Sequence, residues 1–187
     1  ASPVQDHLLL AYDTDMRRTD AVRSDGRMGR SEQTLPAEML PDTITSEGID
    51  FAIRGREKGT DNAVECRGQQ IALPAGDYDR IYLLAAAEEE AAGCFEVDGA
   101  EQWLDIAKWK GFVGQHYAQT IVPDSTAYKT LAVDNPYLRK DPIAWFASHC
   151  HAPKRNIAYQ YCYLYKYGLD IVPGAKTLTL PDNPGIK

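Results

Sequence analysis

The sequence has no long apolar run and no excess of basic charge. Apolar stretches such as residues 8–11 and 83–87 are far shorter than the roughly 18 residues that a membrane-spanning helix needs. With 20 Lys+Arg against 27 Asp+Glu, the formal net charge is −7, and the basic residues form no stripe. Nucleic acids and anionic membranes both attract clustered Lys and Arg. The composition therefore argues against a nucleic acid or a membrane as the partner.

Strong catalytic signatures are also missing, and cysteine is scarce. The chain contains no GxSxG, HExxH, GxxxxGK[ST] or GxGxxG motif. None of its four cysteines belongs to a CxxC pair, and they permit three disulfide pairings without requiring any. A chain of 187 residues can bury a full apolar core without such links, so we expect free buried thiols and predict no cofactor. The cysteines are Cys66, Cys94, Cys150 and Cys162.

What the sequence does contain is the alternation that is typical of β-strands. Its 11 prolines and 14 glycines separate short segments in which apolar residues recur with a period of two. In the clearest case, tyrosines stand at every second position from Tyr159 to Tyr167, and Leu169 and Ile171 continue the series. Side chains two apart share one face of a strand. This stretch therefore predicts one long strand, or a strand that continues through a bend near Gly168.

The same pattern predicts an all-β fold of the antiparallel β-sandwich type, jelly-roll and galactose-binding-like. Turn signals stand at residues 74–77, 97–99 and 173–175. Residues 83–92 are rich in Ala and Glu, so a helix competes there with a strand followed by an acidic loop, and we favour the strand and loop. Further strands are expected at residues 49–54, 62–66, 79–87, 93–97, 102–109, 142–151 and 175–180.

We expect a single domain with an extended N-terminal part. Residues 13–41 carry many charges and few large apolar side chains, so we interpret this stretch as an extended surface segment. It is the main part of an N-terminal segment, residues 1–41, that packs on a sandwich of residues 42–187. The apolar block at residues 35–41 is its expected anchor. The chain starts without methionine and ends in what reads as the first residues of a strand, so we interpret it as a piece of a longer protein.

His149 and His151 form the sharpest polar cluster in the sequence. On a strand, alternation places both imidazoles on one face together with Trp145. Two imidazoles so placed can chelate a divalent metal when a third ligand reaches them, and His116 or Asp105 are the candidates for that ligand. We favour the simpler interpretation that both histidines lie at a strand end, near solvent and hydrogen-bonded to the backbone, with no metal.

Aromatic side chains are abundant, with 11 Tyr, 3 Trp and 4 Phe. A flat ring backed by hydrogen-bonding groups stacks on the apolar face of a sugar, so carbohydrate binding is a candidate function. We interpret Trp109 as a loop platform of this kind and most of the tyrosine row as core. The two acids of a glycosidase need only lie about 5–10 Å apart, and carboxylates are too common in this chain to single out a pair.

Three blocks of sequence resemble a known family. Residues 35–41, residues 71–87, and residues 145–151 with the segments at 163–167 and 178–184 are similar to the C-terminal β-sandwich region of bacterial α-mannosidase-like proteins of glycoside hydrolase family 38. The resemblance implies a secreted or periplasmic glycan-degrading protein with a zinc-bearing catalytic domain. The catalytic residues of that family belong to an N-terminal region that no motif here matches, so none is carried over.

These observations together predict a non-catalytic accessory domain, and not an enzyme on its own. Its expected partners are the catalytic domain of the same polypeptide and a mannose-containing glycan. Two alternatives stay open: an autonomous carbohydrate-binding module, and an independent metal-dependent hydrolase that uses His149 and His151. The residues expected to contact a sugar are Trp109, Trp145, His149, His151 and His116.

Overall fold

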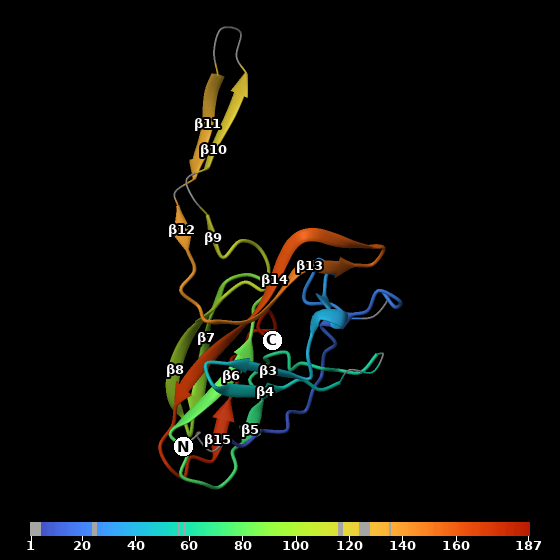
Figure 1. The fold of residues 1–187 in the computed structure, drawn as a ribbon. Helices are drawn as coiled ribbons and strands as arrows, with labels where there is room; N and C mark the ends of the chain where they lie inside the picture. The colour runs from blue at the N-terminus through green and yellow to red at the C-terminus, as the bar shows by residue number, and fades with distance from the viewer. Residues whose placement is uncertain are drawn as a thin grey trace.

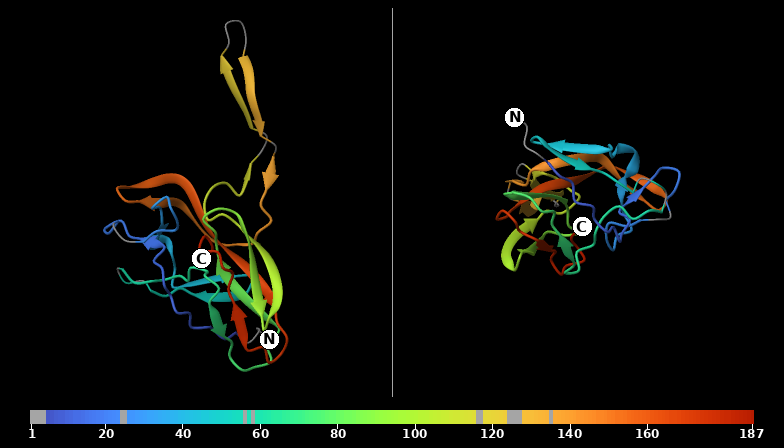
Figure 2. Two further views of the ribbon diagram at one scale, coloured as in Figure 1. Left: turned by 180° about the vertical axis from the view of Figure 1, so that it is seen from behind. Right: turned by 90° about the horizontal axis from the view of Figure 1, so that it is seen from below.

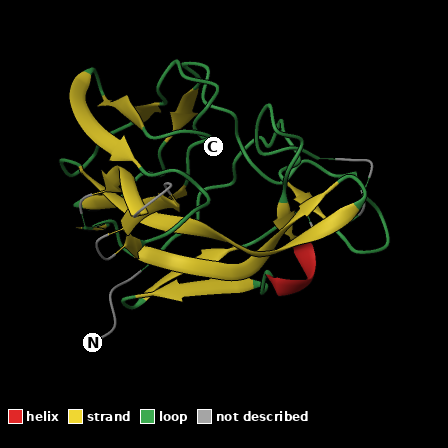
Figure 3. Cartoon of the chain, turned by 90° about the horizontal axis from the view of Figure 1, so that it is seen from above, coloured by secondary structure: helices red, strands yellow, loops and turns green. Residues whose placement is uncertain are grey.

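The computed structural model describes residues 5–23, 26–55, 57, 59–115, 118–123, 128–134 and 136–187. In these residues the chain is built from strands, and the one helical element is the 3₁₀ turn η1 (Ala37–Met39), as Figure 3 shows. No helix in the described part of the chain is long and apolar enough to cross a membrane. The predicted all-β sandwich is confirmed.

Two antiparallel sheets form the sandwich (Figure 1). The first has the order β13–β14–β6 and consists of β13 (Ile143–Ala152), β14 (Arg155–Asp170) and β6 (Arg80–Ala85). The second has the order β5–β15–β7–β8 and consists of β5 (Gln70–Ala72), β15 (Thr177–Thr179), β7 (Ala91–Val97) and β8 (Ala100–Ile106). The strands β6 and β5 are therefore edge strands of their sheets.

The core lies where the inner faces of these two sheets meet. Tyr165 and Leu169 of β14 have no exposed surface, and Phe95 of β7 and Leu178 of β15 are at most 2 % exposed. The Tyr165 hydroxyl donates a 3.2 Å hydrogen bond to the carbonyl oxygen of Lys108, which follows β8. The rings fill the apolar space and their hydroxyls reach backbone groups of the opposite sheet, so the tyrosine row serves packing, as predicted.

β14 confirms the predicted long strand, with one departure. Tyr159 is 81 % exposed and Tyr161 is half-buried, whereas Tyr163, Tyr165 and Tyr167 are buried. Between Ala147 and His149 of β13 the pairing partner on β14 moves from Cys162 to Ala158, so β14 carries two extra residues. Tyr159 lies in this bulge with a positive φ of 59°. The irregularity therefore lies at Tyr159 and not near the predicted bend at Gly168.

The second face of β14 is also buried, because a hairpin covers it. Cys162, Leu164 and Lys166 are all less than 9 % exposed. The hairpin consists of β3 (Thr43–Ser46) and β4 (Ile49–Ala52) and lies over the sheet of β13 and β14 (Figure 2). Lys166 forms an ion pair with Glu47 in the hairpin turn. β14 is thus the middle layer of the molecule, with packed material on both sides.

The N-terminal part enters the core at Leu35, in the block expected to anchor it, and also at Met28, in the stretch expected to lie on the surface. Met28 and Leu35 have no exposed surface and belong to the core. β1 (Arg17–Arg18) pairs in parallel with β2 (Leu35–Pro36). The Arg18 guanidinium donates hydrogen bonds of 2.6 and 2.7 Å to the carbonyl oxygens of Glu32 and Gly26. These bonds fold the charged loop back on itself, which lets a segment with few large apolar residues enter the core.

One of the predicted strands is absent from the structure. Residues 62–66 form no strand, because only Ala63 is paired, in an isolated bridge with Thr14. At residues 83–92 the strand and loop are confirmed against the helix, since β6 ends at Ala85 and β7 begins at Ala91. The predicted tight turn at 97–99 is confirmed, with positive φ values at Asp98 and Gly99 as a type I′ hairpin requires.

Four of the strands that were not predicted follow one another along the chain. They lead away from the sandwich to a separate ladder of β10 with β11 (Figures 1 and 2). The strands are β9 (Gly114–Gln115), β10 (Ala118–Pro123), β11 (Tyr128–Asp134) and β12 (Tyr137–Leu138).

A hydrogen bond of the Tyr167 hydroxyl joins β14 to the chain that follows β8 in the other sheet. The hydroxyl accepts a 2.8 Å hydrogen bond from the buried backbone N–H of Ala107. Tyr167→Phe leaves that N–H without an acceptor, so we expect the free energy of unfolding to fall by about 1–3 kcal/mol. Tyr159→Phe removes an exposed hydroxyl and should change it by less than about 0.5 kcal/mol. Urea denaturation measures the free energy of unfolding of both variants. Equal values would contradict the stabilising role of the hydrogen bond between Tyr167 and Ala107.

Candidate functional site

His149 and His151 lie on β13 where this strand pairs with the start of β14. Their ring centroids are 5.3 Å apart, as two residues on one strand face require. His149 is half-buried, but His151 has no exposed surface. The backbone of His151 exchanges two hydrogen bonds of 3.0 Å with Thr34, which brings the N-terminal part over its ring. The predicted solvent-exposed strand end is therefore wrong for His151.

Two carboxylates of the N-terminal part face the buried ring. The Nε2 atom of His151 lies 3.6 Å from Oδ1 of Asp20 and 3.8 Å from Oε2 of Glu38. Glu38 belongs to η1, and its other carboxylate oxygen accepts a hydrogen bond from the backbone N–H of Asp20. One ligand atom from each of the three residues lies within 4.8 Å of the others. We call Asp20, Glu38 and His151 the acid–histidine cluster.

The ring nitrogens of His151 have no hydrogen-bond partner among the described residues, although both are buried. Burial lowers the pKa of His151, and the opposing effect of Glu38 is smaller, so the imidazole is neutral at pH 7. A hydrogen bond of 3.0 Å from the Asn156 amide lowers the pKa of Asp20. Arg23 also forms an ion pair with Asp20. The acid–histidine cluster therefore holds an ionised acid beside a neutral base.

The tryptophans predicted to contact a sugar are buried. Trp109 has no exposed surface, and Lys110 Nζ lies 5.2 Å from its ring centroid. Trp145 is 9 % exposed, and its indole N–H donates a 3.0 Å hydrogen bond to the carbonyl oxygen of Met39. Neither ring has a face that a sugar can reach, so the predicted loop platform at Trp109 disagrees with the structure.

Of the two predicted third metal ligands, Asp105 does not join the two histidines. His116 lies outside the described residues. Asp105 belongs to β8, in the opposite sheet from His151, and is exposed. The structure brings Asp20 and Glu38 to His151 instead. Their positions in the sequence follow no ligand spacing, and the fold of the N-terminal part alone brings them together.

A cavity of about 920 Å³ lies at the side of the sandwich where the edge strands β5 and β6 are found. Its volume is in the range of small-molecule pockets, about 300–1,000 Å³. Both sheets and the β3–β4 hairpin contribute its mainly apolar wall. The apolar residues of that wall include Phe51, Ile53, Ile71, Leu73, Leu83, Phe95 and Leu178.

Residues 5–12, which we call the N-terminal strap, lie along this cavity. Gln5 is tied to the β3–β4 hairpin, since its amide nitrogen donates to the Gly48 carbonyl at 2.6 Å and its amide oxygen accepts from the Asp50 N–H at 2.9 Å. Asp6 accepts a hydrogen bond from the hydroxyl of Tyr78, in the loop before β6. The strap is therefore attached to both sides of the cavity.

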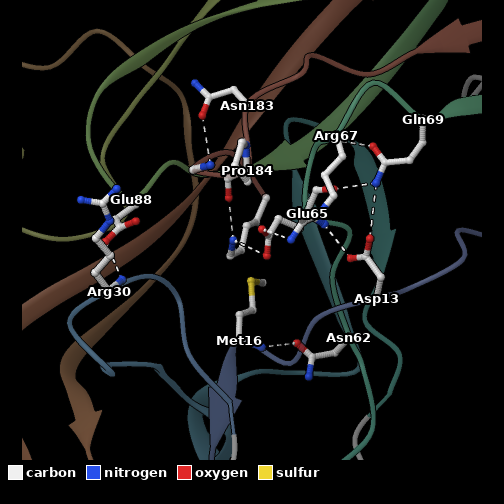
Figure 4. Close-up of polar contacts among 12 residues, drawn as sticks. Asp13, Met16, Arg30, Asn62, Glu65, Arg67, Gln69, Glu88, Asn183 and Pro184 are labelled. Carbon is white, nitrogen blue, oxygen red and sulfur yellow. Dashed lines mark hydrogen bonds and ion pairs between the residues drawn. The ribbon is translucent and has the colours of Figure 1, made fainter.

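A polar network holds the next part of the chain against the cavity (Figure 4). Asp13 accepts hydrogen bonds from the Glu65 N–H at 2.8 Å and from the Gln69 amide at 3.3 Å. Lys187 Nζ lies 3.3 Å from the carboxylate of Glu65, and the Met16 N–H donates to the Asn62 side chain at 3.1 Å. The network joins the N-terminal part to residues 62–69 and to the last residue.

Sequence reasoning also missed an exposed aromatic platform on β8. Trp103 is 66 % exposed, and Glu101 and Asp105 are exposed at the alternate positions beside it. These three side chains share the outer face of β8, because residues two apart on a strand do so. The alternation of charged and aromatic residues from 101 to 105 was the signal that could have identified this face.

The cysteines provide a chemical test of the packing around the site. All four are free thiols, as predicted, and three of them are buried. Burial raises the pKa of Cys66 to about 12 and that of Cys150 to about 11, and it also raises the pKa of Cys162. The thiolate is the reactive form, so these three thiols should react very slowly near pH 8. Cys94, half-buried on β7, is the accessible thiol.

We therefore expect an aryl disulfide reagent to modify one thiol in the native chain and four after denaturation. Partial burial and the neighbouring Glu101 and Glu96 raise the pKa of Cys94, which makes even that reaction slow. Cys94→Ser should abolish the native-state reaction and Cys150→Ser should leave it unchanged. Rapid reaction of two or more native thiols would contradict the packing described here.

Comparison with known protein families matches residues 4–187 to the AziU2-like beta-sandwich domain. A search of the curated proteins found no match. The family match agrees with the two packed sheets and with the confirmed fold class, and it shows no link to the mannosidases that the sequence blocks resemble. Because the match covers nearly the whole chain, the chain belongs to the AziU2-like beta-sandwich domain family.

Proposed function

We propose that this chain is a non-catalytic binding domain whose ligand is a small molecule with an apolar body. The observation that carries the proposal is the cavity of about 920 Å³ beside β5 and β6, with its apolar wall and the N-terminal strap along it. Pockets for small molecules are concave and mainly apolar, with a few polar groups that fix the orientation of the ligand.

The apolar wall favours an apolar ligand on energetic grounds. Protein interiors are close-packed, and side chains that line an empty space lose dispersion contacts on that side. A ligand that fills the space restores these contacts, and it removes apolar surface from water at about 25 cal/mol per Å². Phe51, Ile71 and Leu83 lie on different elements of the wall, so one ligand would contact the hairpin and both sheets.

Charged residues of both signs border the cavity. Arg54, Asp50 and Asp79 belong to its lining and are exposed. A guanidinium at the rim can form charge-assisted hydrogen bonds with the carboxylate or sulfonate of a ligand whose apolar body fills the cavity.

Anilinonaphthalene sulfonate, which has apolar rings and one sulfonate, is a suitable probe. We expect saturable fluorescence enhancement with one site per chain, and displacement of the probe by decanoate. Ala52→Trp places an indole in the cavity wall and should weaken binding at least tenfold. Ala100→Trp makes the same change at an exposed position outside the lining and should leave binding unchanged.

Two results of the probe titration would contradict the proposal, and a control for folding is needed to interpret them. Near-UV circular dichroism of each variant separates loss of the cavity from loss of the fold. A folded Ala52→Trp variant that binds the probe like the wild type would place the probe elsewhere and contradict the proposal. The absence of saturable binding to the wild type would also contradict it.

A second candidate function is contact with a mannose-containing glycan. In this case the chain is an accessory domain of a secreted or periplasmic α-mannosidase-like glycoside hydrolase and packs beside the catalytic domain of the same polypeptide. The resemblance of residues 35–187 to that family supports it. So does Trp103, whose open ring is flanked by the acceptors of Glu101 and Asp105, an arrangement suited to the C–H face and the hydroxyls of a pyranose.

Calorimetric titration with mannose oligosaccharides tests this second function. We expect Trp103→Ala to abolish binding, because stacking needs the exposed ring. Phe146→Ala removes an exposed aromatic ring on β13, in the other sheet, and should not affect it. Lack of binding by the wild type would rule out glycan contact, and hydrolysis of a chromogenic α-mannoside by this chain alone would contradict both non-catalytic functions.

A further inference from the structure

We propose that the acid–histidine cluster binds one divalent transition-metal ion of the zinc class. The ligands are Nε2 of His151 and one carboxylate oxygen each from Asp20 and Glu38. The site is separate from the cavity, since none of the three residues belongs to the cavity lining. It uses His151 from the predicted histidine pair, but the other ligands come from the N-terminal part and not from Asp105 or His116.

The first argument is that the His151 ring is buried and its nitrogens are unsatisfied. The side chain has no exposed surface, and neither ring nitrogen has a hydrogen-bond partner in the described part of the chain. A buried polar group without a partner costs about 1–3 kcal/mol, so nearly all such groups are satisfied in native proteins. Nε2 is directed towards two carboxylate oxygens, and an ion between these three atoms would satisfy it.

The second argument is the distances. Nε2 lies 3.6 Å from the oxygen of Asp20 and 3.8 Å from that of Glu38, which is too long for hydrogen bonds. Zinc binds nitrogen and oxygen ligands at about 2.0–2.1 Å in a tetrahedron, and two such ligands are then about 3.3 Å apart. The three atoms therefore already lie close to the spacing of ligands around one ion, and small side-chain rotations would complete it.

The third argument is charge and donor type. Asp20 and Glu38 carry two negative charges and Arg23 one positive charge, so these three side chains together keep one negative charge. A neutral imidazole with carboxylates is a ligand set for zinc, and three protein ligands leave a fourth position for water. The side chains of Asp20 and Glu38 are 59 % and 43 % exposed, so an ion can enter from solvent.

A metal at this place would link distant parts of the chain. Asp20 and Glu38 belong to the N-terminal part, whereas His151 belongs to β13. An ion held by all three binds the folded state and not the unfolded chain, so it raises stability with the logarithm of its concentration once that exceeds the Kd. The expected role is a structural link that holds the N-terminal part on the sandwich.

The test is zinc titration of the chelator-treated full chain against a chromophoric competitor. We expect one ion per chain, with affinity reduced at least tenfold in Asp20→Asn and in Glu38→Gln. Both residues are exposed enough for the variants to fold. Glu101→Gln is the matched control, because Cys94, Glu96 and Glu101 form the other described group with metal-ligand spacing but include no buried unpartnered side chain.

A second measurement gives an independent readout. Zinc should raise the Tm of the wild type and of Glu101→Gln, and should not raise the Tm of Asp20→Asn or Glu38→Gln. Wild-type protein without saturable zinc binding would overturn the proposal. So would zinc binding that Glu101→Gln weakens, or binding that Asp20→Asn and Glu38→Gln both leave intact, because the ion would then lie at other ligands.

Discussion

The burial of β14 on both faces at residues 162–167 is the constraint on which the rest of the structure depends. One face carries the tyrosine rings that fill the space between the two sheets, and the other is covered by the β3–β4 hairpin. Each face needs its own partner layer, because apolar surface left in water is unfavourable by about 25 cal/mol per Å². The chain therefore forms three layers around one strand, and every candidate site lies at an edge of this arrangement.

The N-terminal part completes the structure at two of these edges. Near β5 and β6, the N-terminal strap and the network around Asp13 border the cavity. At the far end of β13, η1 brings Glu38 and the loop after β1 brings Asp20 to the ring of His151. A single segment thus contributes to both the proposed ligand cavity and the proposed metal site, although its charged composition is that of a surface loop.

Sequence reasoning predicted the features that depend on neighbouring residues and missed those that depend on distant parts of the chain. The tyrosine row, the turn at Asp98 and the strand-and-loop at residues 83–92 were predicted correctly, because pleating and turn chemistry act within a few residues. The burial of Trp109 and the bulge at Tyr159 were not predicted, because both depend on what a second strand places opposite them. The shared face of His149 and His151 was predicted, but the acids beside them were not.

The amino-acid sequence by itself therefore determined the class of fold and the local alternation of its strands. A period of two in the apolar residues indicates which face of a strand is buried, and turn residues indicate where a strand ends. The tertiary structure alone decided where chemistry can occur. Asp20, Glu38 and His151 lie up to 131 positions apart in the sequence (151 − 20 = 131), and no local pattern connects them. They meet because the N-terminal part packs on β13, and such long-range contacts are set by the fit between buried surfaces and not by sequence spacing.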